Sequence, residues 1–251
     1  VDPEEMPELE RYLLTRISIL NEKLKELVSK HDYHAIYTAL LNFCTLELSA
    51  FYFDIRKDSL YCDDIKSIKR RSTSTCLHII FEFLTKWLSP IVSFTCEEAW
   101  KSRSYSNEES ILLQNVKDDE FTYKDISLEK VFEELKRVRK SVTSALELKR
   151  NEKLIGSSLQ AKVILFLSKD TQKIIADLDL AEMCIVSNVE THDISNRSKE
   201  SISIEDEEIY VEIKLADGKK CERCWAVLQE VSSSKNNLCN RCDDVWKTFQ
   251  K

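Results

Sequence analysis

Glycine is almost absent from this sequence, with only Gly156 and Gly218 among 251 residues. Loops that cradle phosphates need several glycines at short spacing, because their backbone must approach the phosphate closely. A Walker loop and a dinucleotide-binding fingerprint are therefore excluded. The chain also has only three prolines, and this scarcity of turn formers argues against a turn-rich all-β fold and favours helices.

Long apolar runs are missing as well. No stretch approaches the roughly 18 uncharged apolar residues that indicate a membrane span, and the first residues are acidic, unlike the basic start of a secretory leader. We therefore expect a chain with no membrane contact, and we also expect a monomer in the cytoplasm. The chain does not begin with Met, which suggests that it is part of a longer protein.

The charge balance limits the possible partners. The chain has 37 Lys and Arg against 44 Asp and Glu, a formal net charge of −7, which is too acidic for a free-standing cationic nucleic-acid clamp. With 43% hydrophobic and 32% charged residues, it can fill a core and solvate its surface. Disorder throughout the chain is excluded.

Three long segments are predicted to be amphipathic helices, because apolar residues recur in them at three- and four-residue steps. These segments are residues 9–28, 33–55 and 76–88. Asp32 has the position of an N-cap for the second. A short helix is predicted to begin at Thr95, which forms a capping box with Glu98, and to carry Trp100 inward before a loop over residues 101–107. Together the helices predict a bundle.

The pattern changes after the bundle. Residues 128–145 show alternating three- and four-residue apolar steps, which fit a coiled-coil partner helix or a helix lying along the bundle, and the shortness of the run favours the second. Beyond Gly156, β-branched segments surround a short helix predicted near residues 171–178, which indicates a small mixed α/β module. These segments are residues 161–167, 183–187, 201–205 and 208–215.

Nine cysteines are an odd number, and five of them follow no spacing rule, so we expect no disulfide framework and a reducing compartment. The other four form two C-x-x-C pairs, Cys221 with Cys224 and Cys239 with Cys242, separated by the fourteen residues 225–238. Two such pairs can place four thiolates tetrahedrally around one zinc ion. Coincidental thiols and a redox C-x-x-C pair are the alternatives, but a redox pair needs no second copy.

A zinc ion held by four thiolates has no open coordination position, so the site is expected to be structural. The short tail that carries it cannot bury enough apolar area to fold alone, and metal binding must supply much of its folding free energy. The sequence thus predicts a mainly α fold in three parts. They are a helical-bundle domain at residues 1–155, a small α/β module at 156–218 and a zinc finger at 219–251.

Basic residues surround the cysteine pairs. The tail from residue 219 onward has seven Lys and Arg against four Asp and Glu, and Trp225 follows a predicted ligand directly. This combination is typical of proteins that contact the backbone and stack on the bases of single-stranded nucleic acid. The alternative is that Trp225 packs on the cluster and the basic residues are only solvated. The candidate contacts are Lys220, Arg223, Trp225 and Arg241.

No catalytic residue is predicted. The four histidines adjoin no recognisable nucleophile. Acidic neighbours such as Glu97 and Glu98 are better explained by helix capping than by an acid/base dyad. The residues therefore indicate binding rather than catalysis.

Several stretches carry a family likeness that extends over essentially the whole chain. They are residues 9–16 (LERYLLTR), 33–44 (YHAIYTALLNFC), 48–62 (LSAFYFDIRKDSLYC), 70–75 (RRSTST), 88–100 (LSPIVSFTCEEAW), 153–163 (KLIGSSLQAKV), 220–225 (KCERCW) and 238–242 (LCNRC). Together they resemble the C-terminal half of class I aminoacyl-tRNA synthetases of the bacterial isoleucyl type. Valyl and leucyl relatives share the helical bundle, and the four-cysteine module argues for the isoleucyl type over them.

The resemblance implies an anticodon-binding bundle in which Arg70, Arg71 and Arg150 can meet tRNA phosphates, while the finger presents Arg223 and Trp225 to unstacked loop bases. It also implies a parent enzyme that charges tRNA(Ile) with isoleucine. ATP and Mg²⁺ would be used only in a catalytic domain whose signatures, like the editing domain, do not occur in these residues. The expected partners are tRNA(Ile) and those N-terminal domains, and this piece is not expected to aminoacylate by itself.

Two other classes of function remain open. The four-cysteine module is also similar to the zinc finger of certain DNA glycosylases, so a DNA-binding or DNA-repair accessory module is one alternative. The negative overall charge gives weight to another, a scaffold that binds no nucleic acid.

Overall fold

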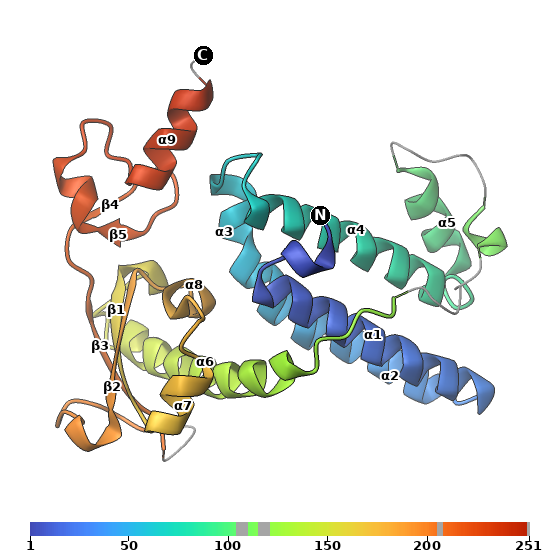
Figure 1. The fold of residues 1–251 in the computed structure, drawn as a ribbon, viewed down its shortest axis with the longest axis horizontal. Coiled ribbons are helices and arrows are strands. Elements are labelled where there is room, and N and C mark those ends of the chain that lie inside the picture. Colours follow the sequence, from blue (N-terminus) through green and yellow to red (C-terminus); the bar gives the residue numbers. More distant parts are fainter. Residues whose placement is uncertain (104–109, 115–120, 205–207, 250–251) are drawn as a thin grey trace. The chain divides into compact units, whose positions relative to one another are not determined.

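The computed structural model describes residues 1–103, 110–114, 121–204 and 208–249 (Figure 1). Contacts divide the chain into two compact units. The first unit comprises residues 1–52 and 65–126, and the second comprises 53–64 and 127–251. The predicted fold class, mainly α with a small sheet and a C-terminal cysteine cluster, is confirmed.

The first unit is built from helices that pack on one another. Its α-helices are α1 (Glu8–Ser29), α2 (Tyr33–Asn42), α4 (Ile68–Leu88) and α5 (Ser93–Lys101). The apolar stripe predicted for α1 is buried from Leu9 to Leu24, whereas Val28 at its end is exposed, and α1 contacts both α2 and α4. This core also contains a hydrogen-bonded polar group. The buried Glu10 carboxylate accepts hydrogen bonds from the Tyr52 hydroxyl at 3.1 Å and from the Thr73 hydroxyl at 3.3 Å.

The second predicted helix is longer than expected. After α2 the chain continues as a π-helical segment, Phe43–Phe53, and then as α3 (Asp54–Cys62). Asp32 caps its start as predicted, accepting from the Ala35 amide at 3.0 Å. Among the described residues, Tyr33–Cys62 is the one helix long and apolar enough to cross a membrane by length and composition. A core helix meets the same criteria, and buried side chains line one side of it, namely Ile36, Leu40, Phe43, Leu48, Phe51, Tyr52 and Ile55.

The polar stretch between the second and third predicted helices is partly helical. Helix α4 begins at Ile68, and the Ser67 side chain caps it by accepting from the Arg70 amide at 3.4 Å. Arg70 and Arg71 therefore lie in the first turn of a helix. The apolar periodicity could not show this, because it starts only at Cys76.

The predicted capping box at Thr95 is wrong. Helix α5 begins two residues earlier, at Ser93, and its N-cap Val92 makes no side-chain capping bond. The chain turns sharply after α4, where the Val92 amide donates to the Leu88 carbonyl at 2.8 Å, and this turn lets the helix restart early. Trp100 is buried as predicted. Residues 104–107 of the predicted loop lie outside the described residues.

In its described residues, the second unit combines α3 with a three-stranded sheet, four further α-helices and a two-stranded hairpin (Figure 1). The helices are α6 (Ser127–Asn151), α7 (Lys169–Ile174), α8 (Leu180–Cys184) and α9 (Asn240–Phe249). The strands are β1 (Ala161–Leu167), β2 (Asn188–Asp193), β3 (Tyr210–Leu215), β4 (Lys219–Lys220) and β5 (Val227–Leu228). In the larger sheet β1 is central, parallel to β2 and antiparallel to β3.

Helix α6 was predicted to lie along the bundle, and that placement stays a prediction. Within the second unit, α6 packs against β3, α7 and α8. Its buried stripe includes Phe132, Leu135, Val138 and Val142. An apolar stripe records only that one face of a helix is buried, so it fits a sheet as well as a helical bundle.

One predicted extended segment is helical instead. Within residues 183–187, Met183 and Cys184 end α8, which Asp179 caps by accepting from the Glu182 amide at 3.1 Å. Ile185 then takes a left-handed conformation with φ of 55°, and β2 starts at Asn188. Of residues 201–205, Ile202 pairs with Val211 by an isolated bridge, and residue 205 lies outside the described residues.

Candidate functional site

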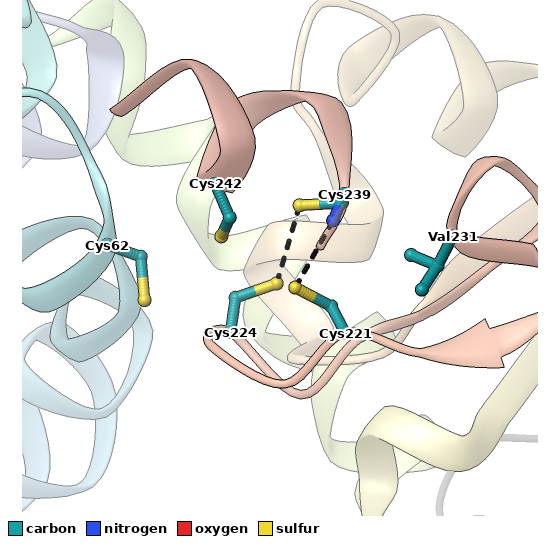
Figure 2. Packing of buried hydrophobic residues seen from close by; sticks show 6 residues of the cluster. All are labelled: Cys62, Cys221, Cys224, Val231, Cys239 and Cys242. Carbon is teal, nitrogen blue, oxygen red and sulfur yellow. Dashed lines mark hydrogen bonds between the residues drawn. The ribbon is translucent and has the colours of Figure 1, made fainter. Parts of the chain in front are cut away.

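The four predicted ligands converge in the C-terminal part of the second unit. The sulfur atoms of Cys221, Cys224, Cys239 and Cys242 all lie within 4.8 Å of one another, and all four residues are buried (Figure 2). The sulfurs of Cys224 and Cys239 are 3.8 Å apart. Zinc–sulfur bonds of about 2.3 Å in a tetrahedron require an edge of about 3.8 Å between sulfurs. The residues present therefore fit a four-thiolate zinc site.

Local backbone structure positions each pair. Cys221 and Cys224 lie in the turn between β4 and β5, where the Cys221 amide donates to the Ala226 carbonyl at 2.8 Å and the Trp225 amide donates to the Cys221 carbonyl at 3.0 Å. Cys239 directly precedes α9, and Cys242 lies in its first turn. Both pairs are thus held by a turn at the end of a short element, which needs no long-range contact to form.

The four closely spaced sulfur atoms favour the binding of a cation, because neighbouring thiolates repel one another. All nine cysteines lie in the described part of the chain, and none of them forms a disulfide. The hydrogen bond from Cys242 lowers the pKa of the Cys224 thiol, whereas burial, with the charge of Cys224 adding to it, raises the pKa of Cys239. One thiolate thus opposes the ionisation of its neighbour. A divalent cation between the sulfurs removes this conflict and binds all four as thiolates.

Gly218 is required at the entry to the finger. Its φ is 115°, and a Cβ at this position would lie 2.2 Å from the carbonyl oxygen of Leu228. Leu228 is the partner of Lys219 in the β4–β5 pairing. A side chain at residue 218 would therefore push the two strands apart.

We expect Gly218→Ala to weaken the finger by about 2 kcal/mol or more, because strain and a backbone clash add. Zinc affinity, measured by competition with a chromogenic chelator, should fall accordingly. Gly156→Ala is the matched control, because a Cβ there meets only the Gln160 side-chain oxygen at 3.5 Å. Equal zinc affinity in the two variants would show that the strand pair tolerates a side chain at residue 218.

The predicted base-stacking residue is exposed. The Trp225 side chain is 61% exposed, and the Lys220 ammonium lies 5.3 Å from the centre of its ring. Trp225 also has a φ of 68°, a left-handed conformation that costs a non-glycine residue about 1–2 kcal/mol. A large, exposed aromatic side chain is therefore held where glycine would be less strained, and this disfavours a purely packing role.

The two arginines of the finger form hydrogen bonds and ion pairs with other residues of the chain. Arg223 donates to the carbonyl oxygens of Cys62 at 2.5 Å and Tyr61 at 3.0 Å. Arg241 forms ion pairs with Asp58 at 2.5 Å and Asp63 at 3.0 Å. Sequence reasoning missed these partners at the end of α3, because nothing in the local pattern joins residues so far apart in the chain.

The remaining predicted tRNA contacts lie elsewhere. Arg70 and Arg71 lie in the first turn of α4 in the first unit. Arg150 lies in the last turn of α6 in the second unit and forms an ion pair with Glu147. For each of these arginines, a contact with RNA stays a prediction.

The fold and the site define a helical protein that ends in a structural zinc finger with four cysteine ligands. A family model described as the anticodon-binding domain of tRNA ligase matches residues 10–165. A second, described as a zinc finger found in FPG and IleRS, matches residues 218–245. The chain belongs to the family of anticodon-binding domains of tRNA ligases, and the four cysteines bind one structural zinc ion.

Similar proteins are named isoleucine–tRNA ligase. The one from Pelagibacter ubique is 40% identical over 227 residues, covering 90% of this chain and 24% of the relative. Those from Ruegeria pomeroyi and Desulforamulus reducens are 38% and 32% identical, covering 96% and 97% of this chain and 25% and 27% of each relative. The chain thus spans about a quarter of the length of these relatives and matches their C-terminal part.

Proposed function

We propose that this chain recognises the anticodon stem and loop of tRNA(Ile) as the C-terminal part of an isoleucine–tRNA ligase. The parent enzyme would charge tRNA(Ile) with isoleucine in the cytoplasm as a monomer, using ATP in domains outside this chain. The observation that carries the proposal is the succession of two family matches, anticodon-binding domain and zinc finger, in one chain that aligns nearly throughout with isoleucine–tRNA ligases. We keep the division into residues 1–155, 156–218 and 219–251 as part of the proposal.

The finger carries side chains that are suited to binding the unpaired bases and phosphates of an RNA loop. Trp225 is exposed, and the exposed Lys219 and Lys220 precede it on β4. Stacking of an unpaired base on an aromatic side chain contributes about 1–3 kcal/mol, and lysines beside it favour the adjacent phosphates. The long helices of the first unit provide a rigid body, and Arg70 and Arg71 on α4 are its candidate phosphate contacts.

The direct test is a binding titration of the zinc-loaded chain at fixed salt, because phosphate contacts make affinity strongly dependent on salt. We expect tRNA(Ile) to bind more tightly than the same tRNA with an altered anticodon. Tighter binding of duplex DNA would favour the DNA-repair alternative. Absence of binding to either nucleic acid would favour a scaffold.

A second test addresses Trp225. We expect Trp225→Ala to lower the affinity for tRNA(Ile) about tenfold, through the loss of one stacked base, with unchanged zinc content. Trp246→Ala is the control, because Trp246 is the other exposed tryptophan of the described part of the finger.

A glycine variant separates binding from folding. Trp225→Gly should stabilise the finger slightly, because it relieves the left-handed strain, while lowering tRNA affinity as much as alanine does. Full tRNA affinity in Trp225→Gly would remove the indole from the interface.

A further inference from the structure

The two C-x-x-C pairs share a feature that zinc binding does not explain. Each has an arginine as its third residue, Arg223 in the first pair and Arg241 in the second. Both guanidinium groups reach the same target, the C-terminal end of α3, which lies about 160 to 180 residues earlier in the chain. We call these contacts the α3 clamp. Its members are Arg223 and Arg241 on the finger and Asp58, Tyr61, Cys62 and Asp63 at the end of α3.

Arg223 caps the helix end. The last carbonyl groups of a helix have no partner within the helix and carry the negative end of its dipole. Both hydrogen bonds from Arg223 go to such carbonyls, those of Tyr61 and Cys62. The planar, charged guanidinium group is well suited to this position. It donates to two carbonyl groups at once, and its positive charge lies at the negative end of the helix dipole.

Arg241 binds carboxylates around the same helix end. Its two terminal nitrogens both contact Asp58, at 2.5 and 3.1 Å, and one of them also contacts Asp63 at 3.0 Å. Asp63 is only 8% exposed, so its charge is costly without a cation nearby. These are charge-assisted hydrogen bonds with bidentate geometry, the strong class of such contacts.

The apolar packing joins the same two elements. Cys62 is buried in one cluster with the four ligand cysteines and Val231 (Figure 2). Its sulfur also lies 3.9 Å from the Arg223 carbonyl oxygen. The metal site is thus packed directly on the end of α3, and the two arginines flank this contact.

The other half of α3 is tied to the α/β part of the second unit. Arg56, which is 1% exposed, forms an ion pair with Glu182 of α8 at 2.8 Å. Arg139 of α6 contacts Asp54 at 2.8 Å. Helix α3 therefore holds the α/β elements at its start and the finger at its end, and it fixes the finger relative to the sheet.

We propose that Arg223 and Arg241 are positioning residues, which fasten the finger to the end of α3 and leave Trp225 and Lys220 as its RNA-contacting groups. The proposal rests on the proposed tRNA binding for its functional consequence. It replaces the expectation that both arginines contact tRNA directly. Their side chains are used by the α3 clamp, and the stacking residue depends on them for its place.

Amide hydrogen exchange tests the α3 clamp without tRNA. In the zinc-loaded chain, Arg223→Ala and Arg241→Lys should each lower the protection of the amides of residues 60–63 about tenfold, because charged hydrogen bonds are lost or misfitted. Lysine keeps the charge but not the fork, so it also serves where alanine disturbs folding. Unchanged protection in both variants would overturn the proposal.

Charge reversal separates positioning from phosphate contact. Asp58→Lys repels Arg241 and adds positive charge beside the finger. If Arg241 binds phosphate, this variant should bind tRNA more tightly, whereas the α3 clamp predicts binding about fivefold weaker. Asp244→Lys is the matched control, with the same change of charge on the exposed face of α9. It should bind as tightly as the unchanged chain or more tightly.

Salt dependence gives the deciding readout. Loss of a phosphate contact in Arg241→Ala would reduce the slope of log affinity against log salt by roughly 0.7 to 0.9, whereas a positioning role lowers affinity at an unchanged slope. A reduced slope, or tighter binding by Asp58→Lys, would overturn the proposal. If the unchanged chain binds no tRNA, the proposed function fails and hydrogen exchange alone decides whether the α3 clamp exists.

Discussion

Removal of zinc is expected to unfold the finger from β4 to α9 and to leave the first unit folded. The finger buries few apolar residues besides its ligands, chiefly Val231 and Val245, so its packing cannot offset the entropy of ordering the segment. Structural zinc contributes about 10–16 kcal/mol of apparent binding free energy in finger peptides. No other interaction in the described part of the finger approaches this magnitude.

The measurement is amide hydrogen exchange before and after chelation. Protection should disappear over residues 219–249 and persist in α1, α2 and α4. Cys242→Ser, which removes one ligand, should reproduce the effect of the chelator. Cys62→Ser is the control, because Cys62 is packed beside the cluster but its sulfur is outside the group of four converging ligands, and it should retain one zinc ion per chain. Persistent protection of the finger after chelation would show that packing alone folds it.

The second large effect is expected at Glu182. Glu182→Ala should destabilise the second unit by about 3–5 kcal/mol, because it removes an ion-pair partner from an arginine that is 1% exposed. Replacing both partners with apolar residues, as in Arg56→Met with Glu182→Leu, should recover much of this loss, since no buried charge then remains. Urea unfolding followed by amide exchange in the second unit measures both.

Glu147→Ala is the matched control for this prediction. Glu147 also pairs with an arginine of the second unit, Arg150, but their side chains are 52% and 42% exposed. An exposed pair contributes about 1 kcal/mol or less, because water and salt screen it. Equal destabilisation by Glu147→Ala and Glu182→Ala would contradict the buried-charge account.

The sequence by itself determined the features that depend on neighbouring residues. The metal ligands could be predicted because each C-x-x-C pair folds within one turn, so its spacing already specifies the chemistry. The N-cap at Asp32 and the long amphipathic helices were predictable for the same reason, since capping bonds and apolar periodicity act over three or four residues. The basic residues around Trp225 suggested base stacking, but the sequence left packing of Trp225 on the cluster open as the alternative.

Tertiary structure alone decided which surfaces those elements contact. The stripe of α6 predicted a buried face, yet only the fold showed that this helix packs against β3, α7 and α8. The sequence predicted that Arg223 and Arg241 contact RNA, and their partners at the end of α3 appear only when the chain is folded. Helix propensity and the turn geometry of a C-x-x-C pair are local. The partner of a long charged side chain instead depends on distant residues that folding brings within about 3 Å.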